Sequence, residues 1–343
     1  MKQPLPKLRF LWKPLQLIGA VYLLYFVYQI AFLLLWQILK ELLDLPWVLG
    51  KASAGSPLPH LLTYLFLGLF PLILAIFTAE RFVFRYQFLP RFFPSHRFVL
   101  KDTIFGLLLG LTLFAFLFFI FKGLGWIEVT REAGQPLLGH DFYLLLSTFL
   151  TAALFEELLY RGVHLMVFTT YWGLPAGIAF SSFFFSLAHL NNPNLSFLGL
   201  FGILNAGVLF ATAYLMTGSL HLAVALHFSW NLGETLFGFQ VSGLSFASHS
   251  FFTLKLTGPE LWTGGMFGPE GGLSGIGLML LGTAAVFLHP AAALGNRRAA
   301  RHRAGRSGAL GHPAHAGRCR HGRPAGRSRG AGQCPQPRSD RHL

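Results

Sequence analysis

The sequence predicts an all-α membrane protein, a polytopic bundle of about eight transmembrane helices followed by a disordered C-terminal tail. Hydrophobic residues make up 53% of the 343 residues, charged residues make up only 12%, and long apolar runs recur along the chain. Soluble domains carry about 25% charged residues. This low charged fraction excludes an ordinary cytosolic protein.

Eight apolar stretches form the predicted bundle, because a helix needs about 20 apolar residues to cross a bilayer. The fourth is longer than a bilayer requires, and the fifth and eighth are the shortest. The stretches are residues 15–39, 61–78, 103–121, 142–168, 174–190, 197–216, 220–237 and 276–288.

The distribution of basic residues predicts the orientation. Basic residues are abundant before the first span and between the second and third spans, whereas the loops after the first and third spans are neutral or acidic. Loops rich in Lys and Arg stay on the cytoplasmic side. We therefore expect an integral protein of the plasma or inner membrane with both termini in the cytoplasm. The basic residues in question are Lys2, Lys7, Arg9 and Lys13, then Arg81, Arg85, Arg91, Arg97 and Lys101.

The formal net charge of +14 would by itself suggest a nucleic-acid partner, but eleven of these charges lie in residues 297–343. That tail is rich in Arg, Gly, Ala, Pro and His and has few large apolar residues, so it cannot form a core. It could be an arm that binds RNA or anionic lipid, or it could result from translation of GC-rich DNA in a shifted reading frame. We favour the second interpretation. We expect no nucleic-acid partner. Both cysteines, Cys319 and Cys334, lie in this tail, so the body has no disulfide and no thiolate metal site.

The fourth span carries Glu156, Glu157 and Arg161 in an otherwise apolar helix, where charges are costly and usually mark function. Glu157 and Arg161 are four residues apart, so they share a helix face and can pair. Glu156 points about 140° away from Arg161 and is left to face something else. An unpaired carboxylate in an apolar environment is suited to acid–base chemistry near neutral pH.

Two further spans carry histidines on defined faces. Phe185 and His189 are four residues apart at the end of the fifth span, and His227 and Asn231 are four residues apart in the seventh, with Glu234 continuing that stripe. A lone membrane histidine is more often a packing residue than a catalytic one. Two others, His164 and His221, are expected at the membrane interface.

This set of side chains fits peptide hydrolysis, which needs an activated water, a base and donors for an oxyanion. Glu156 can be the base, His227 and Asn231 can orient the water and donate to the oxyanion, and His189 can complete the water site. Glu156, His189 and His227 can instead bind Zn²⁺ with a position left open for water. The sequence does not choose between these. Ser274, in a short Gly-x-Ser-Gly match, would offer a serine nucleophile with His289 as its base.

The motifs together resemble a known family. Glu-Glu-x-x-x-Arg at 156–161, Phe-x-x-x-His at 185–189 and His-x-x-x-Asn at 227–231, in this order on successive membrane helices, are similar to those of the type II CAAX prenyl endopeptidase and bacteriocin-processing (Abi) family. The resemblance implies an eight-helix membrane protease, with Glu156, His189, His227 and Asn231 as catalytic residues and Glu157, Arg161 and Phe185 as supporting ones. The family is described both as metalloprotease and as metal-free glutamate protease, and we favour metal-free water activation.

The resemblance and the span pattern divide the chain into four parts. These are N-terminal membrane helices at 1–141, a catalytic helix core at 142–238, a loop with the last membrane helix at 239–290, and the basic tail at 291–343. His189 falls near the outer end of the fifth span whereas Glu156 lies in the middle of the fourth, so a straight-helix topology needs a shift to bring them together.

We expect an intramembrane endopeptidase that acts on a membrane protein or peptide within the lipid bilayer. One alternative is a proton-coupled transporter that uses Glu156, His189 and His227 as a relay. Another is a non-catalytic immunity-type membrane protein that keeps the shape of the motifs. Asn231 favours hydrolysis over a relay, because an amide orients and donates but carries no proton at neutral pH.

Overall fold

The computed structural model describes residues 6–42, 58–84, 92–94, 98–132, 140–246 and 250–289. All of them belong to the first of two units into which the chain divides, Met1–Ala300. The basic tail predicted at 291–343 lies outside the described residues, so the two interpretations of that tail stay predictions.

The N-terminal part consists of a long helix packed against a second, interrupted one. Helix α1 (Pro6–Leu42) contacts α4 (Phe70–Ala79), which continues α3 (Leu58–Thr63) through the π-helical segment η1 (Tyr64–Leu69). A second π-helical segment, η2 (Glu80–Phe84), follows α4. Within η1, the carbonyl of Leu67 accepts hydrogen bonds from Tyr25 Oη and Gln29 Nε2 of α1, both at 2.8 Å. These bonds fasten α1 to the irregular part of its neighbour.

The chain continues as helix α6 and then as a long helical segment that starts with α7. Helix α6 (Val99–Gly123) precedes α7 (His140–Glu157), which continues through the π-helical segment η3 (Leu158–Leu165) into α8 (Met166–Trp172). At Gly173 φ is 89°, a conformation that glycine adopts without strain, and the chain reverses there into α9 (Leu174–Leu187). Helix α9 then packs back along α8 and η3.

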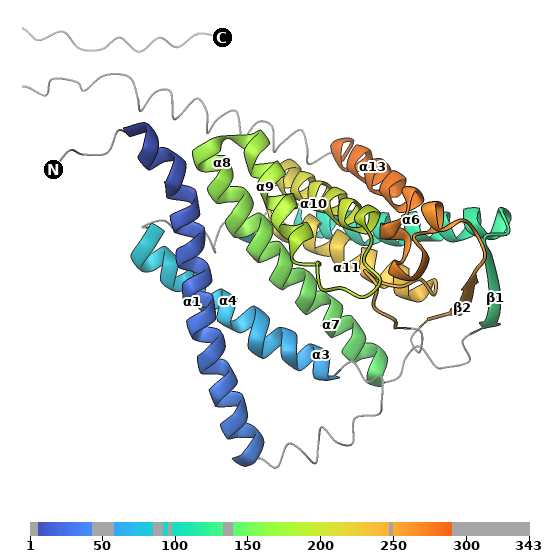
Figure 1. The fold of residues 1–343 in the computed structure, drawn as a ribbon, viewed down its shortest axis with the longest axis horizontal. Coiled ribbons are helices and arrows are strands. Elements are labelled where there is room, and N and C mark those ends of the chain that lie inside the picture. The colour runs from blue at the N-terminus through green and yellow to red at the C-terminus, as the bar shows by residue number, and fades with distance from the viewer. Residues whose placement is uncertain are drawn as a thin grey trace, which may run out of the picture. The chain divides into compact units, whose positions relative to one another are not determined.

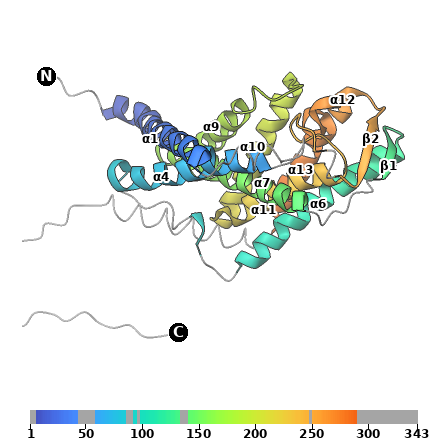
Figure 2. The ribbon, with the colours of Figure 1, turned by 90° about the horizontal axis from the view of Figure 1, so that it is seen from below.

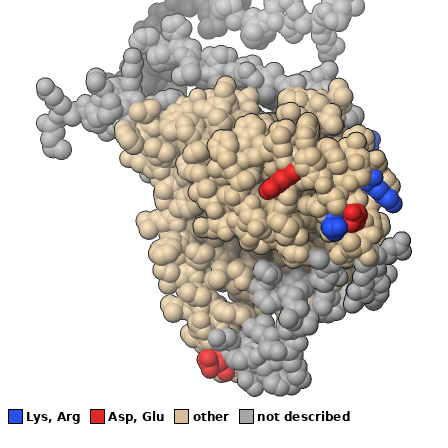
Figure 3. All heavy atoms as spheres, turned by 45° about the vertical axis from the view of Figure 1, so that its right-hand side comes forward, with Lys and Arg blue, Asp and Glu red and all other residues tan. Residues whose placement is uncertain are grey.

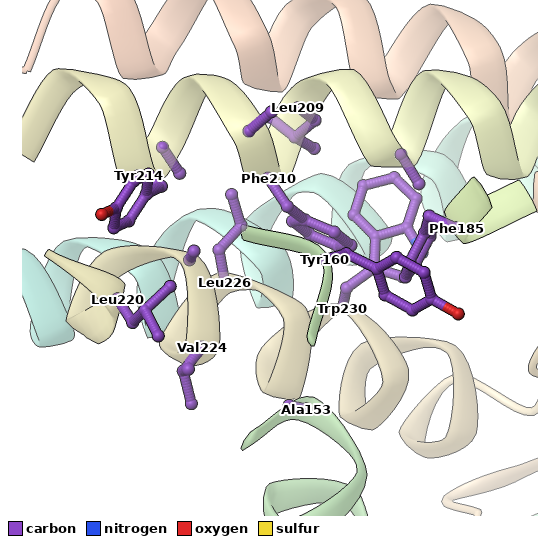
Figure 4. Packing of buried hydrophobic residues seen from close by; sticks show 14 of the residues in the cluster. Ala153, Tyr160, Phe185, Leu209, Phe210, Tyr214, Leu220, Val224, Leu226 and Trp230 are labelled. Atoms are coloured by element: carbon purple, nitrogen blue, oxygen red, sulfur yellow. The ribbon is translucent and has the colours of Figure 1, made fainter. Parts of the chain in front are cut away.

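The centre of the fold is built from α10 (Phe197–Thr217) and α11 (Leu220–Leu236), which contact each other. Helix α10 lies between α9 and α13 (Leu273–Phe287) in both ribbon views (Figures 1 and 2). The buried side chains of this core include Phe210 on α10 and Trp230 on α11, with Tyr160 and Phe185 beside them (Figure 4).

Helices α6 and α11 approach each other closely because two glycines of α6 face the backbone of α11. A methyl group at Gly106 would lie 3.0 Å from the Leu222 carbonyl oxygen, and one at Gly110 would lie 2.9 Å from the backbone nitrogen of Trp230. Ser229 Oγ also donates to the Gly106 carbonyl at 2.9 Å. Small residues at such positions allow membrane helices to pack closely.

Two loops expected to lack regular structure form a small antiparallel sheet outside the helices (Figure 1). Strand β1 (Ile127–Glu132) pairs with β2 (Phe252–Leu256), with Ile127 opposite Leu256. The chain between β2 and α13 continues through the short helices α12 (Glu260–Thr263), η5 (Gly265–Phe267) and η6 (Pro269–Gly271). This is the region predicted as a loop at the start of 239–290.

The helical membrane-protein prediction is confirmed. By length and composition, five helical stretches of the described residues can cross a membrane: Leu11–Leu39, Leu61–Phe84, Val99–Gly123, Phe142–Trp172 and Phe197–Thr217. The other three predicted spans correspond to the shorter helices α9, α11 and α13, of 14, 17 and 15 residues. The face in Figure 3 carries few charged side chains among its described residues, as a lipid-facing surface requires.

Candidate active site

One cavity of about 270 Å³ brings together the four residues predicted as catalytic. Glu156 comes from α7, His189 from the turn after α9, and His227 and Asn231 from α11. The loop between α11 and α13 closes part of the cavity wall with Val241, Ser242, Leu244, Phe246 and Glu270. Two helices, the turn after α9 and one loop therefore converge on a common space.

The carboxylate of Glu156 faces both histidines without touching either. Its Oε2 atom lies 3.9 Å from His227 Nε2 and 4.0 Å from His189 Nε2, which is too far for a direct hydrogen bond. This Oε2 atom is buried and has no hydrogen-bond partner among the described residues. A water 2.8 Å from two atoms separated by this distance would subtend an angle of ~90°, so one water can bridge Glu156 to each ring.

Glu156 and His189 lie at the same level because of the reversal at Gly173. Glu156 lies 16 residues before Trp172, and His189 lies 16 residues after Gly173. The two halves of the helical hairpin therefore place both side chains at equal distances from the turn. The expected depth mismatch was wrong, because the fourth span was taken to end at residue 168 and the helix continues to Trp172.

The partners of the two rings present both Nε2 atoms to Glu156. His189 Nδ1 lies 2.8 Å from the Phe185 carbonyl oxygen, and His227 Nδ1 lies 2.9 Å from Glu157 Oε1. A carbonyl oxygen and a carboxylate only accept, so each Nδ1 carries a proton and donates it. In the neutral ring, Nε2 is then left as the acceptor.

Glu157 contacts both Arg161 and His227 in a buried cluster of charged and titratable side chains. Its Oε1 atom accepts from His227 and pairs with Arg161 Nη1 at 3.1 Å, the pairing expected from their spacing. Both side chains of the pair are entirely excluded from solvent. Arg161 Nη2 also donates to the Gly207 carbonyl of α10 at 3.1 Å. One carboxylate thus neutralises Arg161 and orients His227.

Phe185 and Phe210 enclose this cluster. The Arg161 guanidinium carbon lies 4.4 Å from the ring centre of Phe185 and 5.3 Å from that of Phe210, distances at which a cation is attracted to an aromatic face. His227 stacks on Phe210, with ring centres 4.6 Å apart and planes inclined by 12°. The aromatic rings thus hold a charged group and a catalytic candidate in fixed positions.

Of the three polar residues predicted on one face of α11, only two line the cavity. His227 and Asn231 both line the cavity, whereas Glu234 is fully buried and does not line it. Neither carboxylate oxygen of Glu234 has a hydrogen-bond partner among the described residues. Glu234 is therefore not part of the candidate catalytic set.

Two histidines differ from their predicted roles or surroundings. His164, expected at the interface, is fully buried: its Nδ1 atom donates to the Leu159 carbonyl at 2.9 Å, and its Nε2 atom lies 3.3 Å from Tyr22 Oη.

His289 lies 3.8 Å from Asp102 Oδ1, and burial lowers the pKa of its imidazole. Ser274 is in the first turn of α13 and His289 follows the end of that helix, about 22 Å away at 1.5 Å per residue. The serine alternative is therefore wrong.

Several cavity residues were missed by the sequence reasoning. Tyr64 of η1 and Tyr160 of η3 line the cavity, as do Asn192, Ser242 and Glu270. Ser242 and Glu270 lie in a Gly-rich loop without periodicity, so no pattern pointed to them. The intramembrane position of the two tyrosines in apolar helices was the available signal.

Of the possible metal ligands, Glu156 lies farther from His189 and His227 than the ligands of one tetrahedral Zn²⁺ ion lie from each other. Two Zn²⁺ ligands at 2.0–2.1 Å in tetrahedral geometry are about 3.4 Å apart, whereas Glu156 lies 3.9 and 4.0 Å from the two His Nε2 atoms. Over the described ranges, no group of three or more His, Cys, Asp or Glu side chains is arranged to hold a metal ion. The residues present do not fit a bound metal in this arrangement.

Comparison with known proteins supports the resemblance seen in the motifs. Residues 138–233 match a family model named Rce1-like, whose description is Type II CAAX prenyl endopeptidase Rce1-like. The matched stretch contains Glu156, His189, His227 and Asn231, and it ends before the loop that closes the cavity. No curated protein and no solved structure matches the chain. The match confirms the predicted resemblance to a membrane peptidase family and supports a peptidase at that coarse level.

Proposed function

We propose that this integral membrane protein is an endopeptidase in which Glu156 activates a water molecule for attack on a peptide bond. The observation that carries the proposal is the buried Glu156 Oε2 atom, which has no described hydrogen-bond partner and faces the Nε2 atoms of His189 and His227 across 4.0 and 3.9 Å. An unpartnered carboxylate oxygen in an apolar cavity is costly unless a ligand or water uses it.

The reaction begins with a water held between Glu156 and His189. The water donates one hydrogen to Glu156 Oε2 and the other to His189 Nε2, and Glu156 takes the first proton as oxygen attacks the carbonyl carbon. The carbonyl oxygen becomes an oxyanion. Glu156 then passes its proton to the amide nitrogen, the carbon–nitrogen bond breaks, and a carboxylic acid and an amine are released.

Asn231 and His227 stabilise the oxyanion in this proposal. They lie one helical turn apart on α11 and both line the cavity. The Asn231 amide donates directly, and His227 donates from Nε2 in its doubly protonated form, in which Nδ1 still donates to Glu157 at 2.9 Å. Removing one donor of this kind from an enzyme costs about 10²–10³ in kcat.

The cavity walls favour an apolar stretch of substrate. Beyond the polar residues, the cavity is lined by Phe149, Ile203, Val241, Leu244 and Phe246. Apolar walls exclude bulk water, which strengthens the electrostatic interactions at the reacting bond. Prenylated CAAX proteins, leader peptides and other membrane segments all fit this description.

We also propose that both termini of the chain lie in the cytoplasm, because the loops expected on that side are rich in basic residues.

We propose that the reaction needs no metal ion. Support comes from the separations of Glu156 from the two rings, which exceed those of zinc ligands by about 0.5 Å. The same separations suit a bridging water. The steps above therefore use only side chains of this chain.

The test is the variant Glu156→Gln in full-length protein purified in detergent. Cleavage is measured by mass spectrometry on a farnesylated CAAX peptide, on its unmodified form and on a hydrophobic leader peptide. The variant should lose cleavage by at least about 10²-fold, because an amide cannot take the proton, while its melting temperature stays close to that of the parent. The matched control is Glu128→Gln, which alters an exposed carboxylate paired with Lys255 on β1 and β2. Full activity of Glu156→Gln would refute the mechanism.

A further inference from the structure

Glu270 is a buried carboxyl group in the same cavity, contributed by the loop that follows β2. It is 3% exposed, it lines the cavity, and it lies outside the stretch that the family model matches. Its Oε1 atom accepts from Trp230 Nε1 at 3.0 Å, and its Oε2 atom accepts from Ser242 Oγ at 2.5 Å. Both partners also line the cavity.

These contacts belong to a continuous chain of polar contacts between two catalytic segments. The Asn192 backbone N–H donates to the His189 carbonyl at 3.0 Å, and Asn192 Nδ2 donates to the Ser242 carbonyl at 2.9 Å. Ser242 then reaches Glu270, and Glu270 reaches Trp230, the residue directly before Asn231. We call Asn192, Ser242, Glu270 and Trp230 the polar clasp.

The loop backbone that carries Ser242 and Glu270 has an uncommon conformation at Ser242 and packs closely against α10 at Glu270. Ser242 adopts φ 47°, a left-handed conformation that is uncommon for a residue other than glycine and is often found at functional sites. Its neighbour Gly243 donates from its backbone nitrogen to the Phe267 carbonyl at 2.7 Å. The backbone of Glu270 presses against Gly202 of α10, where a methyl group would collide with the Glu270 carbonyl oxygen. The loop is thus seated on α10 with its carboxyl group aimed at α11.

A carboxyl group is an expensive choice if its role were only to fill this space. Burial raises the pKa of Glu270, and its charge interacts with His189 and His227. Glu234 on α11 also lies near enough to interact electrostatically with Glu270.

We propose that Glu270 is a positioning residue for the peptidase reaction, holding His189 and Asn231 in register across the cavity through the polar clasp. This inference rests on the proposed function. Loss of the carboxyl group leaves the Trp230 N–H without an acceptor and frees the turn at Ser242 from α11. A displacement of about 1 Å at a catalytic group can cost 10²-fold in rate.

The test compares Glu270→Ala, Glu270→Gln and Ser242→Gly in the full chain in detergent, with the peptides named above. Glu270→Ala should lower kcat by about 10²-fold with little change in KM, because positioning acts on the reacting groups. Glu270→Gln should stay within about threefold of the parent, since its amide can make both hydrogen bonds. Ser242→Gly keeps the positive φ and removes the whole CH2OH side chain but leaves the Glu270–Trp230 hydrogen bond in place, so its loss of kcat should be smaller than that of Glu270→Ala. The control is Glu260→Gln, an exposed carboxylate in the same loop.

Hydrogen–deuterium exchange supplies a readout that does not depend on cleavage. The segments around His189 and Asn231 should exchange faster in Glu270→Ala and at the parental rate in Glu270→Gln. Unchanged activity and exchange in Glu270→Ala would overturn the proposal, and so would an equal loss in Glu270→Gln, which would mean that the carboxyl group acts chemically. If the parent cleaves none of the peptides, the proposed function fails, while the exchange comparison still decides whether the clasp holds the two segments.

Discussion

The two roles of Glu157 can be separated by a pair of substitutions. Glu157 Oε1 lies 3.1 Å from Arg161 Nη1 and 2.9 Å from His227 Nδ1, and both Glu157 and Arg161 are fully buried. In Glu157→Gln the guanidinium loses its counter-charge inside the protein. Breaking a buried ion pair on one side costs about 3–5 kcal/mol. At 2–4 °C per kcal/mol, the melting temperature should fall by roughly 6–20 °C.

The double variant Glu157→Gln/Arg161→Met removes both charges and should recover most of this stability. Replacing a whole buried pair by neutral residues of similar volume is often neutral or stabilising. Activity should not recover, because His227 still donates to an amide in place of a carboxylate. In serine-protease triads the change from carboxylate to amide behind the histidine costs about 10⁴-fold, and we expect a loss of at least about 10²-fold here.

The assay pairs thermal unfolding in detergent with peptide cleavage on the same preparations. The reasoning would be refuted by a double variant that regains both stability and full activity, because Glu157 would then act only as the counter-charge of Arg161. It would also be refuted by a single variant as stable as the parent.

Three further predictions concern metal, helix packing and pH. Treatment with a strong chelator should leave cleavage unchanged, and a loss that Zn²⁺ restores would overturn the metal-free mechanism. Gly110→Ala should lower stability by about 1–3 kcal/mol and reduce activity, because its methyl group would meet the backbone of α11 beside Asn231, whereas Gly123→Ala on the same helix, with no atom within 4 Å, should change neither. Burial raises the pKa of the Glu270 carboxyl group, which means that its neutral form favours the folded protein. The stability that this neutral form contributes is therefore complete below the ordinary pKa of about 4.3 and is lost as the pH rises through the raised pKa. The melting temperature of Glu270→Gln should therefore decline less than that of the parent between about pH 4.5 and 8, and parallel curves would contradict this.

The parts of the site that could be predicted from the sequence are those set by helix periodicity. The spacing of Glu157 and Arg161 predicted their pairing, and it also turned Glu156 toward a different neighbour, as its position in the cavity shows. The motif order on successive helices predicted the family resemblance. The pairing follows from a spacing of four residues, and it forms although Arg161 lies in the π-helical segment η3.

Contacts outside that periodicity could not be predicted. The clasp of Ser242 and Glu270 depends on a turn with positive φ and on a loop seated against Gly202, and neither leaves a repeating pattern. The strands β1 and β2 were missed although both alternate apolar and polar residues, because their surroundings were taken as loops. His164 was misplaced because its ring bonds a carbonyl five residues earlier, within a π-helical segment that an α-helical pattern does not reveal.

Two π-helical segments lie next to the cavity and contribute polar side chains of otherwise apolar helices to its wall. Segment η1 begins at Tyr64 and η3 contains Tyr160 and Arg161, and both tyrosines line the cavity. A π-helical turn widens the helix and changes the direction of the side chains after it, and such turns are frequent at functional sites. Glu156 and Glu157 both lie on the regular helix α7, where adjacent side chains point about 100° apart. Glu157 is committed to Arg161 and His227 in the interior, while Glu156, still on the regular helix, keeps one oxygen free for the cavity.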